Sequence, residues 1–212
     1  MYRYFLLGVL SLVLFSCKPD KPVLSGGSGE LSDSVSVEKE DVQLSRDEQI
    51  LQFNKEFLQA VKDKNWEKIA ENIHPEKGLC FSPYAYFVED KSVCLKKGNF
   101  LKSIKEKKQF LWGITDGEGL EIKETIPQYF ENYVYGKNFL KDAQVHINES
   151  VASGNSINNV EEAFPDDFYV ENYVPGKDPE TADFTWQALR VVMQKYKGKW
   201  YAVALINDRW TI

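Results

Sequence analysis

The chain has few of the residues that build metal and redox sites. Its 212 residues include two histidines, His74 and His146, and three cysteines. No HExxH or CxxC spacing accompanies them, and the acidic segment 116–119 lacks the further ligands of a calcium loop. We therefore predict no metal and no cofactor. Both histidines are interpreted as structural or surface residues, and segment 116–119 as a turn.

The sequence also lacks the basic stripe that nucleic-acid binding requires. It carries 26 lysines and arginines against 32 aspartates and glutamates, a formal net charge of −6. The local excess of lysines between Lys96 and Lys108 fits the solvated face of a helix better than a phosphate-binding surface. We predict no nucleic-acid partner.

The start of the chain carries an export signal. Arg3 precedes an apolar run over 4–15, and Ser16 stands directly before Cys17. This run is shorter than the roughly 20 apolar residues that a membrane-spanning helix needs. The pattern therefore indicates a cleaved leader and not a spanning anchor.

Residues 14–17, Leu-Phe-Ser-Cys, resemble a bacterial lipobox, although Phe15 is bulkier than the usual residue there. The resemblance implies that 1–16 is a lipoprotein signal peptide and that Cys17 is lipidated, so that acyl chains hold the protein to a membrane. Lys18 resembles the residue that follows the cysteine in outer-membrane cargo. We predict an extracytoplasmic lipoprotein, on the periplasmic side or the cell surface, and most simply in the outer membrane. An ordinary cleaved secretory signal is the alternative.

Two further parts follow the leader. Segment 17–44 contains the lipidated cysteine and a Gly/Ser-rich stretch without apolar periodicity, which predicts a flexible tether. Segment 45–212 is predicted to be one domain, large enough to bury about 70% of its unfolded surface.

Helices are predicted first in this domain, and strands after them. A capping box at 45–48 opens an amphipathic helix, and Asn65 caps a shorter one that ends near His74. Further helices are predicted over 100–111 and 125–136. Strands are predicted over 79–88, which Pro83 limits to a sheet edge or a bulge, and over 93–95, 144–149 and 168–174.

The last segment, 184–212, predicts a long β-hairpin around a two-residue turn at Lys197-Gly198. Counting outward from this turn places Gln187 opposite Asp208, and Thr185 opposite Trp210. Gln187, Asp208 and Trp210 are therefore expected to project together at the far end of one face. The rest of that face is apolar: Leu189, Val191, Met193, Trp200, Ala202, Ala204 and Ile206.

The order of helices and strands is an α+β pattern. The helix pair over 53–73 and the hairpin with its Lys-Gly-Lys-Trp turn resemble the NTF2-like superfamily. The resemblance implies a cone, in which a curved, mainly antiparallel sheet wraps an N-terminal helix pair. Isomerases, dehydratases, binding modules and docking domains share that fold, so the fold decides no function.

Two classes of function follow for the mouth of such a cone. The sequence has no nucleophile elbow, phosphate loop or paired-carboxylate motif, which favours a non-enzymatic ligand-binding or protein-interaction domain. The alternative is a small-molecule lyase, isomerase or hydrolase with Asp208 as acid or base, its pKa raised by aromatic neighbours. Asp208 could instead cap the sheet or pair with Arg190 or Arg209. The predicted ligand-binding residues are Gln187, Asp208, Trp210, Tyr86 and Tyr129.

The last two hypotheses concern a disulfide bond and a homodimer. Export would place Cys80 and Cys94 where disulfides persist, so we predict that they are bonded, with two separate thiols as the alternative. The other face of the hairpin is apolar, and a homodimer through it is a third hypothesis. Its residues are Trp186, Val192, Tyr196, Tyr201, Val203 and Leu205.

Overall fold

The computed structural model describes residues 44–211. The predictions for the leader, Cys17 and most of the tether lie outside the described residues. Within 44–211, none of the helices combines the length and the apolar character that a membrane crossing requires.

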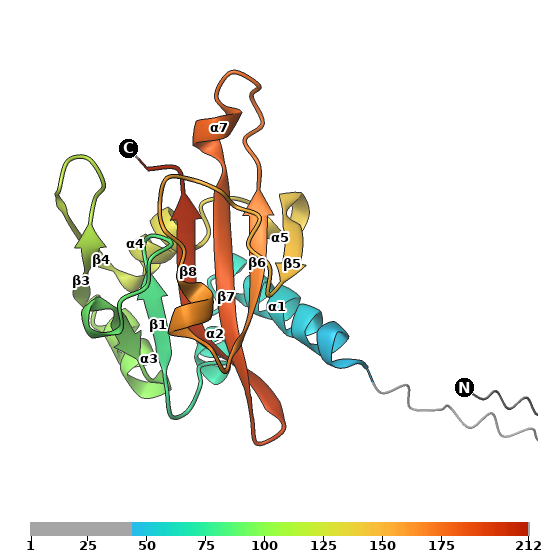
Figure 1. Cartoon of the computed structure of the whole chain (residues 1–212). Helices are drawn as coiled ribbons and strands as arrows, with labels where there is room; N and C mark the ends of the chain where they lie inside the picture. Colours follow the sequence, from blue (N-terminus) through green and yellow to red (C-terminus); the bar gives the residue numbers. More distant parts are fainter. Residues whose placement is uncertain (1–43, 212) are drawn as a thin grey trace, which may run out of the picture. The chain divides into compact units, whose positions relative to one another are not determined.

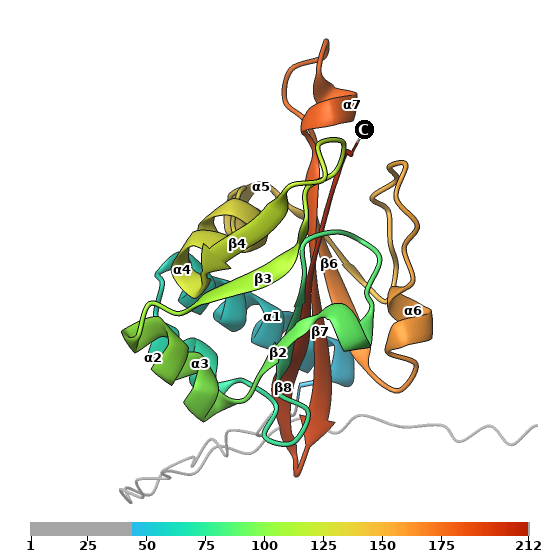
Figure 2. The ribbon, with the colours of Figure 1, turned by 90° about the vertical axis from the view of Figure 1, so that its left-hand side faces the viewer.

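A curved six-stranded sheet forms the centre of the domain (Figures 1 and 2). Its strand order is β2-β1-β8-β7-β6-β5, with β1 parallel to β8 and every other pair antiparallel. β3 and β4 form a separate two-stranded ribbon. The strands are β1 (Leu79–Ser82), β2 (Val93–Leu95), β3 (Gln109–Ile114), β4 (Glu121–Thr125), β5 (Gln144–Ile147), β6 (Phe168–Val174), β7 (Gln187–Tyr196) and β8 (Lys199–Arg209).

Helices cover the two faces of this sheet unequally. Most helices lie on one side of the sheet, which we call the helix face, and α6 lies on the other, the α6 face (Figure 2). The helix face holds the main core, whereas the α6 face carries a smaller apolar cluster. The elements on the helix face are α1 (Arg46–Lys62), α2 (Trp66–Glu71), α3 (Lys97–Lys105), α4 (Ile126–Tyr129), the π-helical turn η2 (Phe130–Val134) and α5 (Phe139–Asp142). The others are η1 (Glu89–Lys91), α6 (Val160–Ala163) and α7 (Ala182–Thr185).

The N-terminal helix pair forms as its caps predict. The Ser45 hydroxyl accepts a hydrogen bond from the Glu48 backbone N–H, and the Glu48 carboxylate accepts one from the Ser45 backbone N–H. The Asn65 side chain caps α2 by accepting a hydrogen bond from the Lys68 backbone N–H at 3.0 Å. A buried amide pair between Asn54 and Asn172, at 2.8 Å, joins α1 to β6.

Several predicted boundaries are wrong for identifiable reasons. β1 ends at Ser82 because Pro83 has no N–H to continue the ladder, and β1 lies between β2 and β8 instead of at an edge. The third helix ends at Lys105, because Lys107 adopts a positive φ of 50°, and the chain then enters β3. The ribbon and the short helices α5, α6 and α7 were not predicted.

The β7–β8 hairpin follows the predicted register only as far as Ala202. Met193 pairs with Ala202, but Val192 pairs with Ala204, so Val203 is an extra residue on β8. Such a bulge exchanges the two faces for every later residue of the strand. Consequently Asp208 lies opposite Ala188 and Gln187 lies opposite Arg209. The predicted pairing of Gln187 with Asp208 is wrong.

A disulfide joins β1 to β2. Cys80 and Cys94 are direct partners in this antiparallel pair, with Cα atoms 4.0 Å apart and the two sulfur atoms bonded. The bond closes the connection that contains η1.

The face assigned to a homodimer is largely covered by the chain itself. Val192 and Val203 are buried in the cluster with α6, and Leu205 belongs to the main core because of the bulge. Trp186 is also buried, and its ring lies against Gly154. These four residues are therefore not an open surface. The homodimer itself stays a prediction.

Candidate functional site

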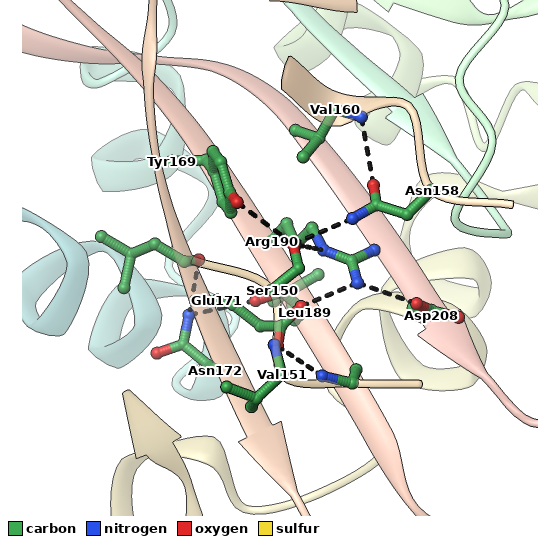
Figure 3. Close-up of polar contacts among 12 residues, drawn as sticks. Ser150, Val151, Asn158, Val160, Tyr169, Glu171, Asn172, Leu189, Arg190 and Asp208 are labelled. Carbon is green, nitrogen blue, oxygen red and sulfur yellow. Dashed lines mark hydrogen bonds and ion pairs between the residues drawn. The ribbon is translucent and has the colours of Figure 1, made fainter. Parts of the chain in front are cut away.

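Asp208 lies in a buried ion cluster on the α6 face. Arg190 Nη2 is 2.7 Å from Glu171 Oε2 and 2.9 Å from Asp208 Oδ2, and all three residues are buried (Figure 3). We call Glu171, Arg190 and Asp208 the Arg190 cluster. Burial raises the pKa of Asp208, and the charge of Arg190 acts against that shift. The sequence left three structural roles open for Asp208: a cap of the sheet, a pair with Arg190 or a pair with Arg209. The structure has the ion pair with Arg190.

A segment of backbone closes this cluster from solvent. The N–H groups of Val151 and Ala152 donate to Glu171 Oε1 at 2.7 and 2.8 Å. Ser150 Oγ lies 3.3 Å from Arg190 Nε and accepts a hydrogen bond from Asn158 (Figure 3). Two carboxylates therefore share one guanidinium, and Glu171 also accepts hydrogen bonds from two N–H groups of the loop. This arrangement orders the loop and leaves Asp208 3% exposed.

A hollow lies at the other side of the same hairpin end. It has a volume of about 360 Å³ and contains Gln187 and Trp210, so two of the three residues predicted to project together do meet. A smaller hollow of about 180 Å³ shares Arg209 and Trp210. We call the larger one the end hollow. Its lining also includes Phe184, Thr185, Trp186, Glu131, Asn132, Gly136 and Lys137.

Arg209 takes the place that the sequence assigned to Asp208. It is the cross-strand partner of Gln187, its Nη2 donates to the Asn132 carbonyl at 2.7 Å, and its guanidinium lies 4.7 Å from the centroid of the Tyr133 ring. Its Nε is buried without a hydrogen-bond partner. Burial lowers the pKa of Arg209, although a guanidinium remains protonated at neutral pH.

The floor of the end hollow is fixed by two amides. Gln187 Nε2 donates to Asn207 Oδ1 at 2.6 Å, and Asn207 Nδ2 donates to the Pro83 carbonyl at 2.7 Å. Gly136 lies directly against Gln187, since a Cβ at this position would be 2.7 Å from Gln187 Oε1. Gln187 is therefore oriented before any ligand arrives.

The two tyrosines predicted to bind ligand lie away from the end hollow. Tyr86 is 52% exposed and lines a separate small hollow that also contains Trp112. Tyr129 is completely buried and stacks on Trp112, with ring centroids 4.0 Å apart. Burial raises the pKa of Tyr129 well above its ordinary value, and its hydroxyl has no hydrogen-bond partner. The prediction that these residues share one cavity with Asp208 is wrong.

The histidines have separate local roles. His74 Nδ1 accepts hydrogen bonds from the backbone N–H groups of Glu76 and Lys77 at 3.2 and 3.0 Å, and burial lowers the pKa of this imidazole. His146 Nδ1 lies 3.3 Å from Glu149. Within residues 44–211, no group of three or more histidine, cysteine, aspartate or glutamate side chains is placed to hold a metal ion.

Comparison with known proteins gives little further information. No family model matches the chain, and no curated protein matches it. Among solved structures it is similar to a designed NTF2-like protein, a variant of Rd1NTF2_05 with five substitutions, at 13% sequence identity and a TM-score of 0.35. The match covers 77% of this chain and 99% of the designed one. We base no functional conclusion on this similarity.

Proposed function

We propose that this chain is an extracytoplasmic, membrane-anchored lipoprotein whose domain, residues 45–212, is a non-enzymatic ligand-binding or protein-interaction domain of the NTF2-like type. The mixed α+β architecture, with helices packed on one face of a curved sheet, supports the proposed fold. The lipobox-like residues before and at Cys17 support the anchor.

One observation carries the binding proposal: the hairpin end presents an open hollow whose polar groups include an arginine and two amides. Arg209 and Gln187 line it beside Trp210. The carboxylate in its lining that the structure describes, Glu131, is a surface side chain bonded to Lys64 at 3.1 Å. Convergent polar groups beside aromatic walls are typical of ligand sites.

The enzymatic alternative needs Asp208 on the helix face, where it would reach a bound molecule. The bulge at Val203 turns this residue to the α6 face, where Arg190 and the loop at Ser150 enclose it. An acid or base must come within hydrogen-bond distance of the proton it transfers. Asp208 therefore gives no support to a lyase, isomerase or hydrolase.

Native mass spectrometry tests the binding proposal. The mature chain carrying Cys17→Ala, which removes the proposed acylation site, would be purified gently and compared with the same chain carrying Trp210→Ala. We expect a retained small molecule on the first protein and its loss from the second. A retained molecule that survives Trp210→Ala would contradict the placement of the site.

Membrane fractionation tests the anchor. The wild-type chain is expected in the membrane fraction, with incorporation of a labelled fatty acid, and the Cys17→Ala chain in the soluble fraction. If the variant stays with the membrane, the lipoprotein proposal is wrong whatever the domain binds.

A further inference from the structure

Arg209 carries a charge that no carboxylate in the described part of the chain pairs with directly. Within residues 44–211, ion pairs with N–O distances up to 4.0 Å include Arg190 and Arg46 but not Arg209. Arg190 contacts two carboxylates directly, whereas Glu124 acts on the charge of Arg209 without forming an ion pair within 4.0 Å. A partly buried cation without a directly bonded carboxylate can still bind an anion from outside the chain.

The guanidinium is held ready for such an anion. The Asn132 carbonyl fixes Nη2 and the ring of Tyr133 supports one face of the group. Nε remains a buried donor without a partner, next to Nη2 on the same edge of the guanidinium. Because Nε is buried, a carboxylate in the hollow would accept its hydrogen bond from a terminal N–H group of the guanidinium.

The charges around Arg209 favour a singly charged ligand over a doubly charged one. Lys137 adds a cation to the end hollow, Asp116 adds an anion to the smaller hollow next to it, and Glu124 acts on the charge of Arg209. Glu131 is paired with Lys64. The surroundings are therefore close to neutral, so a carboxylate on the guanidinium meets less repulsion than a dianionic phosphate.

The walls of the hollow favour an apolar part beside that carboxylate. Trp210 and Phe184 meet edge to face, with ring centroids 4.9 Å apart, and Phe184 is 56% exposed. An exposed aromatic ring beside a hollow of about 360 Å³ offers apolar surface to a small ligand.

We infer that the end hollow binds an aryl or alkyl monocarboxylate, with the carboxylate on Arg209 and the apolar part against Trp210 and Phe184. This inference rests on the proposed binding function and names the class of ligand for the same site.

Titration with three matched probes tests it. Phenylacetate, its neutral analogue phenylacetamide, and phenyl phosphate would each be added to the mature chain carrying Cys17→Ala. Nitrogen–proton NMR would follow the Arg209 Nε–H and the Trp210 indole N–H. We expect saturable shifts of both signals with phenylacetate, and binding at least about tenfold weaker with phenylacetamide and with phenyl phosphate.

Two arginine variants distinguish binding at Arg209 from a general effect of removing one positive charge. Arg209→Gln should weaken phenylacetate binding at least about tenfold, whereas Arg46→Gln, at an exposed arginine of α1, should leave it unchanged. Thermal unfolding would verify that both variants are folded. If Arg209→Gln does not fold, the comparison of phenylacetate with phenylacetamide on the parent chain decides.

The experiment distinguishes failure of the monocarboxylate inference from failure of the proposed binding function. Equal binding of phenylacetate and phenylacetamide, tighter binding of phenyl phosphate, or unchanged binding to Arg209→Gln would overturn the monocarboxylate inference. The binding function would survive if a neutral or phosphorylated probe still shifted the Trp210 signal. If no probe shifts either signal, the inference is wrong, and the absence of any retained molecule in native mass spectrometry would then remove the binding function as well.

Discussion

Arg190 Nη2 and Asp208 Oδ2 lie 2.9 Å apart behind the sheet, on the face opposite the main core. The pair exists because Val203 is an extra residue on β8, which turns Asp208 toward Arg190 and turns Arg209 toward Gln187. The hairpin thus separates its charges. Asp208 and Glu171 are enclosed on one face, and Arg209, which no carboxylate of the described residues contacts directly, lines a hollow on the other.

The Arg190 cluster should contribute strongly to stability. Arg190→Met leaves Glu171 and Asp208 buried without their cation, and we expect the free energy of unfolding to fall by about 3–5 kcal/mol. Urea denaturation measures this loss. The matched variant Arg46→Met removes an exposed arginine paired with Asp47 and should change stability by no more than about 1 kcal/mol. Similar small losses in both variants would contradict the importance of the buried cluster.

The buried hydroxyl of Tyr129 should cost stability. Because this group has no hydrogen-bond partner, Tyr129→Phe is expected to leave the free energy of unfolding unchanged or to raise it by up to about 1 kcal/mol. Tyr169→Phe is the comparison, since its hydroxyl contacts Ser150 and Glu161, and it should lower stability by about 1 kcal/mol. A larger loss for Tyr129→Phe than for Tyr169→Phe would show that the Tyr129 hydroxyl is satisfied in solution.

The disulfide should stabilise the β1–β2 pair. Cys80 and Cys94 are separated by 14 positions in the sequence, and a bridge over a loop of this length stabilises by about 3 kcal/mol in the chain-entropy model. We expect the double variant Cys80→Ser with Cys94→Ser to unfold at lower urea concentration. Adding a reductant should shift the wild-type chain and leave the double variant unchanged. A wild-type transition that ignores the reductant would argue against a stabilising bond.

Stability should fall as the pH drops below the ordinary histidine pKa of about 6.5. Burial and the charge of Lys77 lower the pKa of His74 in the folded state, with Asp167 and Glu76 acting in the opposite direction. The unfolded chain therefore binds the proton first, and acidification favours unfolding. His74→Asn keeps a side-chain oxygen as acceptor but cannot be protonated, so this part of the pH dependence should vanish. Urea midpoints between pH 7 and 5 measure it, and equal slopes in both proteins would rule out His74 as its source.

Local signals in the sequence were sufficient for much of the fold. The capping box at Ser45, the cap at Asn65 and the turn at Lys197-Gly198 each depend on neighbouring residues, and the structure has all of them. β6 also has the predicted bounds, Phe168–Val174. These elements need no information from distant parts of the chain.

The bulge could not be predicted because its cause is not local. Val203 and Ala204 are both small and apolar, so either can face a core, and the alternation over β8 looks regular without an interruption. Its position depends on contacts made after folding. β1 pairs with β8 in parallel at Cys80 and Ala204, and Asn207 bonds to the Pro83 carbonyl.

The candidate site was predicted only in part, because the bulge that decides which side chains face it could not be predicted. The end of the hairpin, with Gln187 and Trp210, is where the hollow lies, but the sequence placed Asp208 there instead of Arg209. In the sequence, Arg209 is one of several cations adjacent to an acid. Only the folded chain shows that the guanidinium lies over the Tyr133 ring with its Nε buried and unbonded.

The extra residue at Val203 also determines which kind of genetic change could alter this site. Substitutions at Asp208 or Arg209 remove one group and leave the other facing its present side of the sheet. Deletion of one residue in β8 between the turn and position 208 would instead invert the strand beyond it, sending the acid to the hollow and the arginine to the opposite face. Among chains that share this fold, length variation within this strand would thus separate hollows with an exposed base from hollows with an exposed cation.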